Sequence, residues 1–432
     1  MPIILKNLTA DQVHTGLAHV GVTPRLARQI QTAVIRHGTL PSGPGISARL
    51  MKEVRKLTVI PRLALIEKKA RVNPELRTLL TVAAPKLEEV LELIDPGVAL
   101  VEYFHPGRVE FEDGKVDELW AFVITRGESV LVPVSVTQKD LRDTAEAYAR
   151  AASGEPGELD ALSAKLYGWL VEPVRGKLAG CDTVVIVPWD VLYYVPFSAL
   201  APEAGAPPFG AEKRLVVAPS AGVYRYIRPK RASKHRRLFA MGDPETEQHS
   251  LEQAEKEVKT ISELFDKSTL YLRSDATETI LKAGIGKADV VHFACHGRLD
   301  EAHPELSHLL LTPDAANDGR LEVHEIFGLD WRGVSLVTLS ACSSGKGKLG
   351  GGNDIIGLTR GFIFAGAPTV LCTLWEVDDE STRIFMQEFY RHYAAGTAKP
   401  EAFQLAQAKL RASKKWSHPY HWAPFVLWGD WK

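Results

Sequence analysis

The chain has few cysteines, and none of them stands in a pattern typical of metal or disulfide sites. Four occur in 432 residues, Cys181, Cys295, Cys342 and Cys372, and each lies in or beside an apolar run. Because no CxxC pair is present, neither a structural zinc site nor a disulfide framework is expected. A small buried hydrophobe is the default interpretation of each cysteine.

The first residues lack the features of a secretory signal, and no apolar run is long enough to span a membrane. The opening "MPIILK" has neither a basic start followed by an apolar core nor a small-residue cleavage site. A membrane-spanning helix requires roughly 20 apolar residues in succession, and the sequence offers no such run. We therefore expect a cytoplasmic protein with no membrane partner.

Two common motifs are absent from the glycine-rich stretch "SLVTLSACSSGKGKLGGG", which runs from Ser335 to Gly352. A phosphate-binding P-loop requires GxxxxGK followed by Ser or Thr, but neither Lys346 nor Lys348 precedes a hydroxyl residue. A serine hydrolase requires GxSxG, and the serines of this stretch do not stand in that frame. Neither nucleotide binding nor serine catalysis is expected here.

The composition and the apolar pattern predict an α/β fold. Hydrophobic residues make up 45% and charged residues 24% of the chain, as in a globular protein with a sizeable core. From Pro96 onward, short apolar strands alternate with helices expected at Lys139–Ala152, Leu159–Leu178, Leu251–Phe265, Asp354–Ala365 and Glu380–Tyr393. Such alternation predicts a mostly parallel sheet with helices on both faces. The basic stretch "RPKRASKHRR", residues 228–237, is expected to connect two related halves.

Residues 1–72 are strongly basic and have a helical pattern. Before Asn73, twelve Lys and Arg residues accompany only Asp11, Glu53 and Glu67. We expect a small helical domain that recruits an anionic partner, either RNA or an activating protein. A solvated helical surface, balanced by acidic residues elsewhere in the chain, explains the same charges equally well.

Two of the expected strands end in residues suited to nucleophilic catalysis. "VVHFACHG" ends in Cys295, His296 and Gly297, and "LVTLSAC" ends in Cys342. Catalytic groups gather at the carboxyl ends of strands in open α/β sheets. If the two strands are neighbours, a thiol, an imidazole and backbone N–H donors for an oxyanion meet there. A metal site is less favoured, because strand alternation places His292 and His296 opposite Cys295.

Four longer segments carry a resemblance to a known family. They are "VVHFACHG", "GRLEVHEIFGLDWRGVSLVTLSACSSG", "GGNDIIGLTRGFIFAGAPTVLCTLWEVDDES" and "HPYHWAPFVLWGD". They resemble the CHAT domain, a bacterial branch of the caspase and separase fold. The resemblance implies a caspase-like, mostly parallel sheet flanked by helices, with residues 93–235 as a pseudo-caspase half and residues 236–432 as the catalytic half.

The same resemblance implies the roles of single residues. His296 occupies the position of the family's catalytic histidine, and Cys342 occupies the position of its nucleophile. The backbone N–H groups of Gly297 and Cys342 fall where the oxyanion hole belongs, and Cys295 becomes an inward-packed strand residue. These roles require no metal and no organic cofactor.

The resemblance also bears on substrate specificity. Metacaspases, which are related, hold a basic P1 side chain with an acidic residue where this chain has Ser340, and this difference weakens a trypsin-like interpretation. Separase holds a P1 arginine with an aspartate that matches Asp379 of "LWEVDD", where Glu376 and Asp378 are nearby and Trp375 lines the pocket or packs in the core. Alternatively, Asp378 and Asp379 only cap the helix that follows.

These features together predict a latent cysteine endopeptidase that cleaves protein substrates, with residues 1–72 as the sensing or recruiting part. A second resemblance covers only residues 1–72. It is to the helical accessory domain of radical-SAM ribosomal-RNA adenine methyltransferases, whose cysteine triplet this chain lacks. The competing hypothesis is a CHAT-like scaffold that binds nucleic acid or protein without catalysis.

Overall fold

The computed structural model describes residues 87–106, 109–111, 114–155, 157–222, 227, 237–298, 306–340 and 353–432, together with scattered positions before residue 60. The chain divides into two compact units, Met1–Ala83 and Ala84–Lys432. In the first unit, the described residues include a short parallel pair, β1 (Ile3–Ile4) and β2 (Thr58–Val59). Most of the predicted helical segment 1–72 and of the connecting stretch 228–237 lies outside the described residues.

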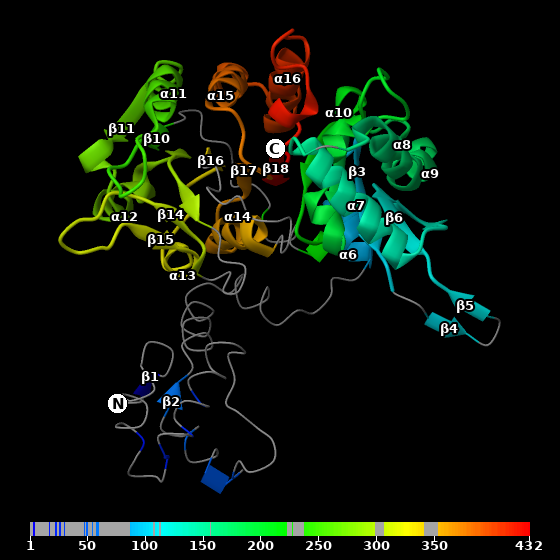
Figure 1. Ribbon diagram of the computed structural model, residues 1–432, viewed down its shortest axis with the longest axis horizontal. Helices are drawn as coiled ribbons and strands as arrows, with labels where there is room; N and C mark the ends of the chain where they lie inside the picture. The colour runs from blue at the N-terminus through cyan, green and yellow to red at the C-terminus, as the bar shows by residue number, and fades with distance from the viewer. Residues whose placement is uncertain are drawn as a thin grey trace. The chain divides into compact units, whose positions relative to one another are not determined.

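In the described part of the second unit, eleven strands form one sheet in the order β11-β10-β12-β16-β17-β18-β9-β8-β3-β6-β7 (Figure 1). The N-terminal half of the unit supplies β3 (Val98–Phe104), β6 (Leu119–Thr125), β7 (Glu128–Val134), β8 (Thr183–Val187) and β9 (Arg214–Val217). The C-terminal half supplies β10 (Arg237–Gly242), β11 (Lys267–Leu272), β12 (Val290–Ala294), β16 (Leu336–Leu339), β17 (Thr369–Thr373) and β18 (Phe425–Gly429). The two sets of strands join where β18 pairs with β9.

The sheet is mostly parallel, as predicted. Within the described part of this sheet, antiparallel pairing is confined to β17 with β18, β3 with β6, and β6 with β7. The strands β8, β12, β17 and β18 are buried along their whole length. Because both faces of the sheet are covered, these strands have apolar residues at successive positions instead of only at every second one.

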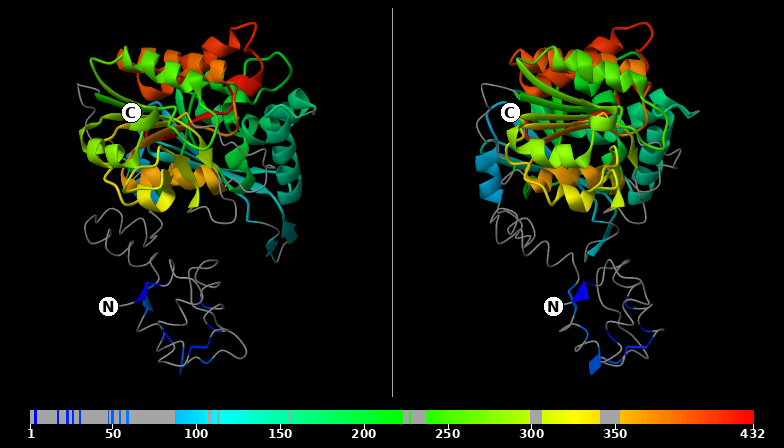
Figure 2. Two further views of the ribbon diagram at one scale, coloured as in Figure 1. Left: turned by 60° about the vertical axis from the view of Figure 1, so that its left-hand side comes forward. Right: turned by 90° about the vertical axis from the view of Figure 1, so that its left-hand side faces the viewer.

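Helices cover both faces of the sheet. Figures 1 and 2 show α11 (Glu252–Ser262), α15 (Asp379–Ala394) and α16 (Lys399–Arg411) over one face of the C-terminal half, with α12 (Glu278–Gly284), α13 (Val323–Ile326) and α14 (Asn353–Ala365) at the other. The N-terminal half is flanked by α6 (Leu87–Leu93), α7 (Gln138–Ala152), α8 (Leu159–Leu170), α9 (Glu172–Arg175) and α10 (Phe209–Glu212). None of the helices in the described ranges has both the length and the apolar character needed to cross a membrane.

The helix predicted at Leu159–Leu178 is wrong in its length. The structure divides this stretch into α8, α9 and a 3-10 turn at Gly176–Leu178. Pro173 is the reason, because it lacks the N–H that would continue α8 and is instead favoured in the first turn of a new helix. The other four predicted helices agree with α7, α11, α14 and α15 to within a few residues.

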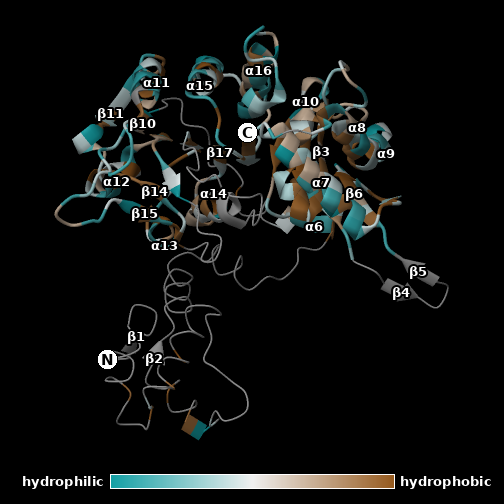
Figure 3. Cartoon of the chain, viewed as in Figure 1, coloured by the Kyte–Doolittle hydropathy of each residue, from teal (hydrophilic) through white to brown (hydrophobic). Residues whose placement is uncertain are grey.

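Among the described residues of the second unit, apolar clusters pack the helices against the sheet. The C-terminal cluster packs the aromatic face of α15, with Phe385, Phe389 and Tyr390, against the strands and α16. The N-terminal cluster packs α7 and α8 against β3, β6 and β8. Figure 3 shows both hydrophobic and hydrophilic colour on helices such as α7 and α11, as expected of helices with one face on the core. These clusters fix the sheet on which the candidate site stands.

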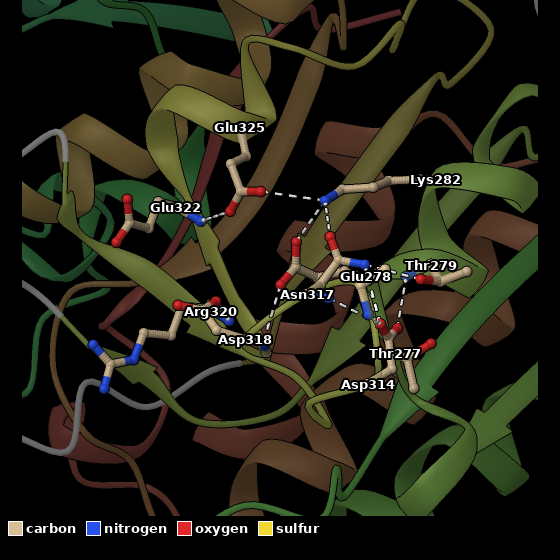
Figure 4. Close-up of polar contacts among 12 residues, drawn as sticks. Thr277, Glu278, Thr279, Lys282, Asp314, Asn317, Asp318, Arg320, Glu322 and Glu325 are labelled. Carbon is tan, nitrogen blue, oxygen red and sulfur yellow. Dashed lines mark hydrogen bonds and ion pairs between the residues drawn. The ribbon is translucent and has the colours of Figure 1, made fainter. Parts of the chain in front are cut away.

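A small antiparallel sheet stands beside the main one, formed by β13 (Gly297–Arg298), β14 (His308–Leu310) and β15 (Arg320–Glu322). A polar cluster attaches it to α12 (Figure 4). Lys282 contacts the fully buried Glu278 at 2.8 Å, Asn317 at 2.6 Å and Glu325 at 3.2 Å. Glu278 in turn accepts a hydrogen bond from the Gly319 N–H at 3.1 Å.

A separate hairpin comprises β4 (Val109–Phe111) and β5 (Gly114–Val116).

Candidate active site

The two strand ends singled out in the sequence are neighbours in the sheet. Strands β12 and β16 pair in parallel, and the Ser340 N–H donates to the Phe293 carbonyl at 2.8 Å, just beyond the end of β16. His296 follows the carboxyl end of β12, and Ser340 follows that of β16. Cys342 lies two residues further along the chain, outside the described residues. The strands that lead to His296 and Cys342 are therefore neighbours, as a pair of imidazole and thiol requires.

A backbone carbonyl holds the His296 imidazole. The Nε2 atom of the half-buried His296 lies 2.9 Å from the carbonyl oxygen of His249, in the segment between β10 and α11. A carbonyl oxygen only accepts hydrogen bonds, so Nε2 carries the proton. In the neutral ring the lone pair then resides on Nδ1, which becomes the basic atom. His249 was not predicted as a site residue, because the contact uses its backbone.

The backbone N–H of Gly297 is oriented away from the small sheet. Gly297 faces Leu309 across β13 and β14, and the Leu310 N–H donates to the His296 carbonyl at 2.8 Å. This bond identifies Gly297 and Leu309 as a non-hydrogen-bonded pair, in which both N–H groups point away from the partner strand. A donor aimed in this way can serve an oxyanion.

The described cysteines are unsuited to act as nucleophiles. Cys295 and Cys372 are buried, and burial raises the pKa of each thiol to about 12. Burial also raises the pKa of Cys181. Since the thiolate is the nucleophilic form, these side chains are unreactive near neutral pH. The prediction that Cys295 packs inward is confirmed by its complete burial.

A buried polar network lies beneath the strand ends and was not predicted. His292 contacts Glu257 at 2.9 Å through Nε2 and the Tyr390 hydroxyl at 3.2 Å through Nδ1, and Tyr390 contacts Thr338 at 2.6 Å. Both nitrogens of His292 are thus engaged in structural contacts that join β12 and β16 to α11 and α15. In the described ranges, no group of three or more His, Cys, Asp or Glu side chains is arranged to hold a metal ion.

The residues considered for substrate specificity have different environments. Trp375 is largely buried in the core, and its Nε1–H donates to the Tyr420 carbonyl at 3.2 Å. Asp378 caps α15 by accepting from the N–H groups of Glu380 and Ser381, each at 3.0 Å. Glu376 is exposed. The capping interpretation therefore holds for Asp378, and Trp375 is a core residue.

Asp379 is the acidic residue whose surroundings involve His296. It is the first residue of α15 and is exposed. Its pKa is nevertheless raised, chiefly because the surrounding protein removes water from the carboxyl group. The negative charges of Asp378, Glu257 and Glu376 raise the pKa further, whereas His296 lowers it. Asp379 and His296 are thus close enough to interact through their charges.

Comparison with known proteins identifies the family. The sequence model of the CHAT domain matches residues 160–430. The chain belongs to the CHAT domain family. The match starts at residue 160, so it gives no support to the radical-SAM resemblance drawn for residues 1–72.

Two relatives carry the name tetratricopeptide repeat protein 28. The protein from Mus musculus is 26% identical over 325 residues, which cover 61% of this chain and 13% of that protein. The protein from Homo sapiens is 29% identical over 215 residues, covering 41% and 8%. This chain thus spans only a small part of the length of these relatives.

Solved structures that match the chain include a separase complex and a cysteine proteinase. The separase–securin complex of Saccharomyces cerevisiae gives a TM-score of 0.49 at 10% identity, covering 94% of this chain and 33% of that one. The Arg-specific cysteine proteinase gingipain R gives a TM-score of 0.39 at 8% identity, covering 68% and 74%. The family assignment rests on the sequence match.

Proposed function

We propose that this CHAT domain protein is a cysteine endopeptidase that uses Cys342 as nucleophile and His296 as base. The observation that carries the proposal is the pairing of β12 with β16, since the strand ends that precede the two residues in the sequence are side by side. The His249 carbonyl supports it further, because it fixes the His296 tautomer whose Nδ1 is basic. The buried state of Cys181, Cys295 and Cys372 also favours Cys342 as the nucleophile.

The chemistry follows from these groups. His296 Nδ1 takes the proton of the Cys342 thiol, and the thiolate attacks the peptide carbonyl carbon. The N–H groups of Gly297 and Cys342 stabilise the negative charge that develops on the carbonyl oxygen. The imidazolium gives its proton to the departing amine, and a water molecule, deprotonated by His296, then hydrolyses the thioester.

Asp379 favours substrates with a basic P1 side chain. Its carboxylate stands in the field of Asp378, Glu257 and Glu376, and a lysine or arginine that entered beside it would relieve their mutual repulsion. Electrostatic complementarity of this kind selects among substrates more strongly than it adds affinity. We therefore propose cleavage after Arg or Lys.

The test is cleavage of a peptide library, read by mass spectrometry, with the full-length chain. Cys342→Ala and His296→Ala are expected to abolish cleavage, whereas Cys295→Ala, a buried matched control, is expected to retain it. Cleavage by the Cys342→Ala protein would contradict the proposal. If the unaltered chain and all three variants are inactive in every partner and RNA condition tested, the scaffold hypothesis is favoured.

We also propose that residues 1–72 regulate the peptidase by binding an anionic partner. The support is their charge, twelve Lys and Arg against three acidic residues. Binding of RNA to the full chain at two salt concentrations tests this, because phosphate contacts weaken steeply with added salt. Binding that is unchanged when Lys52, Arg55 and Lys56 are replaced by Gln would argue against this surface.

A further inference from the structure

Two adjacent strands end in residues with unusual backbone conformation. Strands β10 and β11 pair in parallel up to Gly242 and Leu272, and the residues that follow, Asp243 and Arg273, have φ angles of 45° and 49°. Left-handed backbone costs a residue other than glycine about 1 kcal/mol or more. Such conformations persist only where surrounding contacts hold them, so the contacts of Asp243 are informative.

The Asp243 carboxylate is a junction of several contacts. It is 3% exposed; one oxygen accepts from the Leu251 N–H at 2.5 Å, and the other accepts from the Ser250 hydroxyl at 2.7 Å. Arg273 pairs with it at 3.3 Å. Its own backbone N–H donates to the Ala294 carbonyl at 3.0 Å, at the end of β12. One residue therefore connects the segment before α11 to the strand that leads to His296.

The segment held by Asp243 carries the carbonyl that binds His296. Residues 244–251 contain neither helix nor strand, and His249 and Ser250 are exposed, so packing contributes little to their position. At the other end of the segment, the Glu245 N–H donates to Thr312 at 2.9 Å. The two bonds from the Asp243 carboxylate lie at the residues directly after His249, and they determine where its carbonyl points.

We propose that Asp243 is a positioning residue for His296, acting through the His249 carbonyl. The inference rests on the proposed function, in which His296 is the base. With Asp243 intact, the carbonyl keeps the proton on Nε2 and the lone pair on Nδ1. Without the carboxylate the carbonyl moves, the tautomer with the proton on Nδ1 becomes populated, and that form cannot accept the thiol proton.

The variant Asp243→Asn tests this, because asparagine tolerates left-handed backbone and keeps the shape of the side chain. Its amide nitrogen cannot accept from Ser250 or pair with Arg273. The matched control is Asp289→Asn. Asp289 is 5% exposed and pairs with Arg237 at 3.2 Å, next to the beginning of the same strands β10 and β12. Like Asp243, it is a buried carboxylate paired with a half-exposed arginine, but it lies at the amino ends of the strands.

The decisive readout is the tautomer of His296, measured by ¹⁵N NMR of the full chain labelled at histidine, with His296→Gln to assign the signal. We expect Nε2–H to dominate in the unaltered chain and in Asp289→Asn. In Asp243→Asn the Nδ1–H form should rise severalfold, and kcat should fall on the order of tenfold with KM unchanged. An unchanged tautomer in folded Asp243→Asn would overturn the inference.

A second variant keeps the test valid if Asp243→Asn does not fold. Ser250→Ala removes one of the two bonds without changing charge, and we expect a smaller shift of the same sign; no shift would overturn the inference. Because NMR reports on the imidazole directly, the result is independent of cleavage. A chain with the expected tautomers but no peptidase activity would contradict the proposed function alone.

Discussion

Replacing Asp378 by alanine is expected to lower the free energy of unfolding of the unit 84–432 by about 1 to 2 kcal/mol. The Asp378 carboxylate accepts the N–H groups of Glu380 and Ser381, each at 3.0 Å. Loss of an N-cap costs about 1 kcal/mol, and loss of a negative charge at a helix N-terminus adds about 0.3 to 1 kcal/mol. Asp378→Asn retains the cap and should cost only the second amount.

The neighbouring Asp379 is expected to behave in the opposite way. Its pKa is raised, chiefly by desolvation and then by Asp378, so the folded state binds protons more strongly than the unfolded state does. The ionised carboxylate therefore reduces stability as the pH rises above its unfolded pKa of about 4. Asp379→Asn should be at least as stable as the unaltered chain near pH 7, and this difference should vanish towards pH 4.

Thermal unfolding, followed by circular dichroism near pH 7 and pH 5, measures both effects. For a unit of this size, Asp378→Ala should lower Tm by about 2 °C or slightly more, whereas Asp379→Asn should not lower it. Cleavage of paired peptides that differ in Arg or Gln at P1 completes the assay, and only Asp379→Asn should lose the preference for Arg. A destabilised Asp379→Asn, or a retained preference, would refute the assignment of capping to one residue and specificity to the other.

Three further predictions concern reactivity and packing. Iodoacetamide near neutral pH should alkylate Cys342 but not Cys295 in the native chain, as peptide mass spectrometry can show, because burial raises the pKa of Cys295 to about 12. Gly429→Ala should markedly lower Tm, since φ is +93° and the added methyl group would overlap the backbone carbonyl oxygen of Pro368, directly before β17. Lys282→Met should cost roughly 3 kcal/mol in urea unfolding near pH 7, because it leaves the buried Glu278 carboxylate without its cation. This cost should decrease as the pH falls and Glu278 becomes protonated, since desolvation raises its pKa; a cost independent of pH would contradict the explanation.

Much of the fold could be predicted because both faces of the sheet are covered. Strands such as β8, β12 and β17 must then be apolar at every position, and this produces the continuous runs that the sequence displays. The boundary within 159–178 was missed because the apolar pattern continues through it, while the interruption depends on the single N–H that Pro173 lacks.

The candidate site was predictable only where side-chain identity carries the chemistry. His296 and Gly297 stand out as a pair after an apolar strand. That this strand neighbours the one before Cys342 was only a condition in the sequence, and the pairing of β12 with β16 meets it. The His249 carbonyl could not be found in this way, because every residue has one. Glu257 lies in an amphipathic helix where an acidic residue is ordinary, and only the fold brings it against His292.

The buried contact of Glu257 with His292 explains how the candidate site keeps its geometry. Glu257 belongs to α11, His292 to β12, Tyr390 to α15 and Thr338 to β16, and one chain of hydrogen bonds joins them. These four elements are also the ones next to His249, His296, Asp379 and Ser340 in the sequence. A buried polar network that is fully paired resists displacement, because each broken bond leaves an unsatisfied group costing about 1 to 3 kcal/mol. The network therefore resists relative displacement of the four elements, which lead to His249, His296, Ser340 and Asp379.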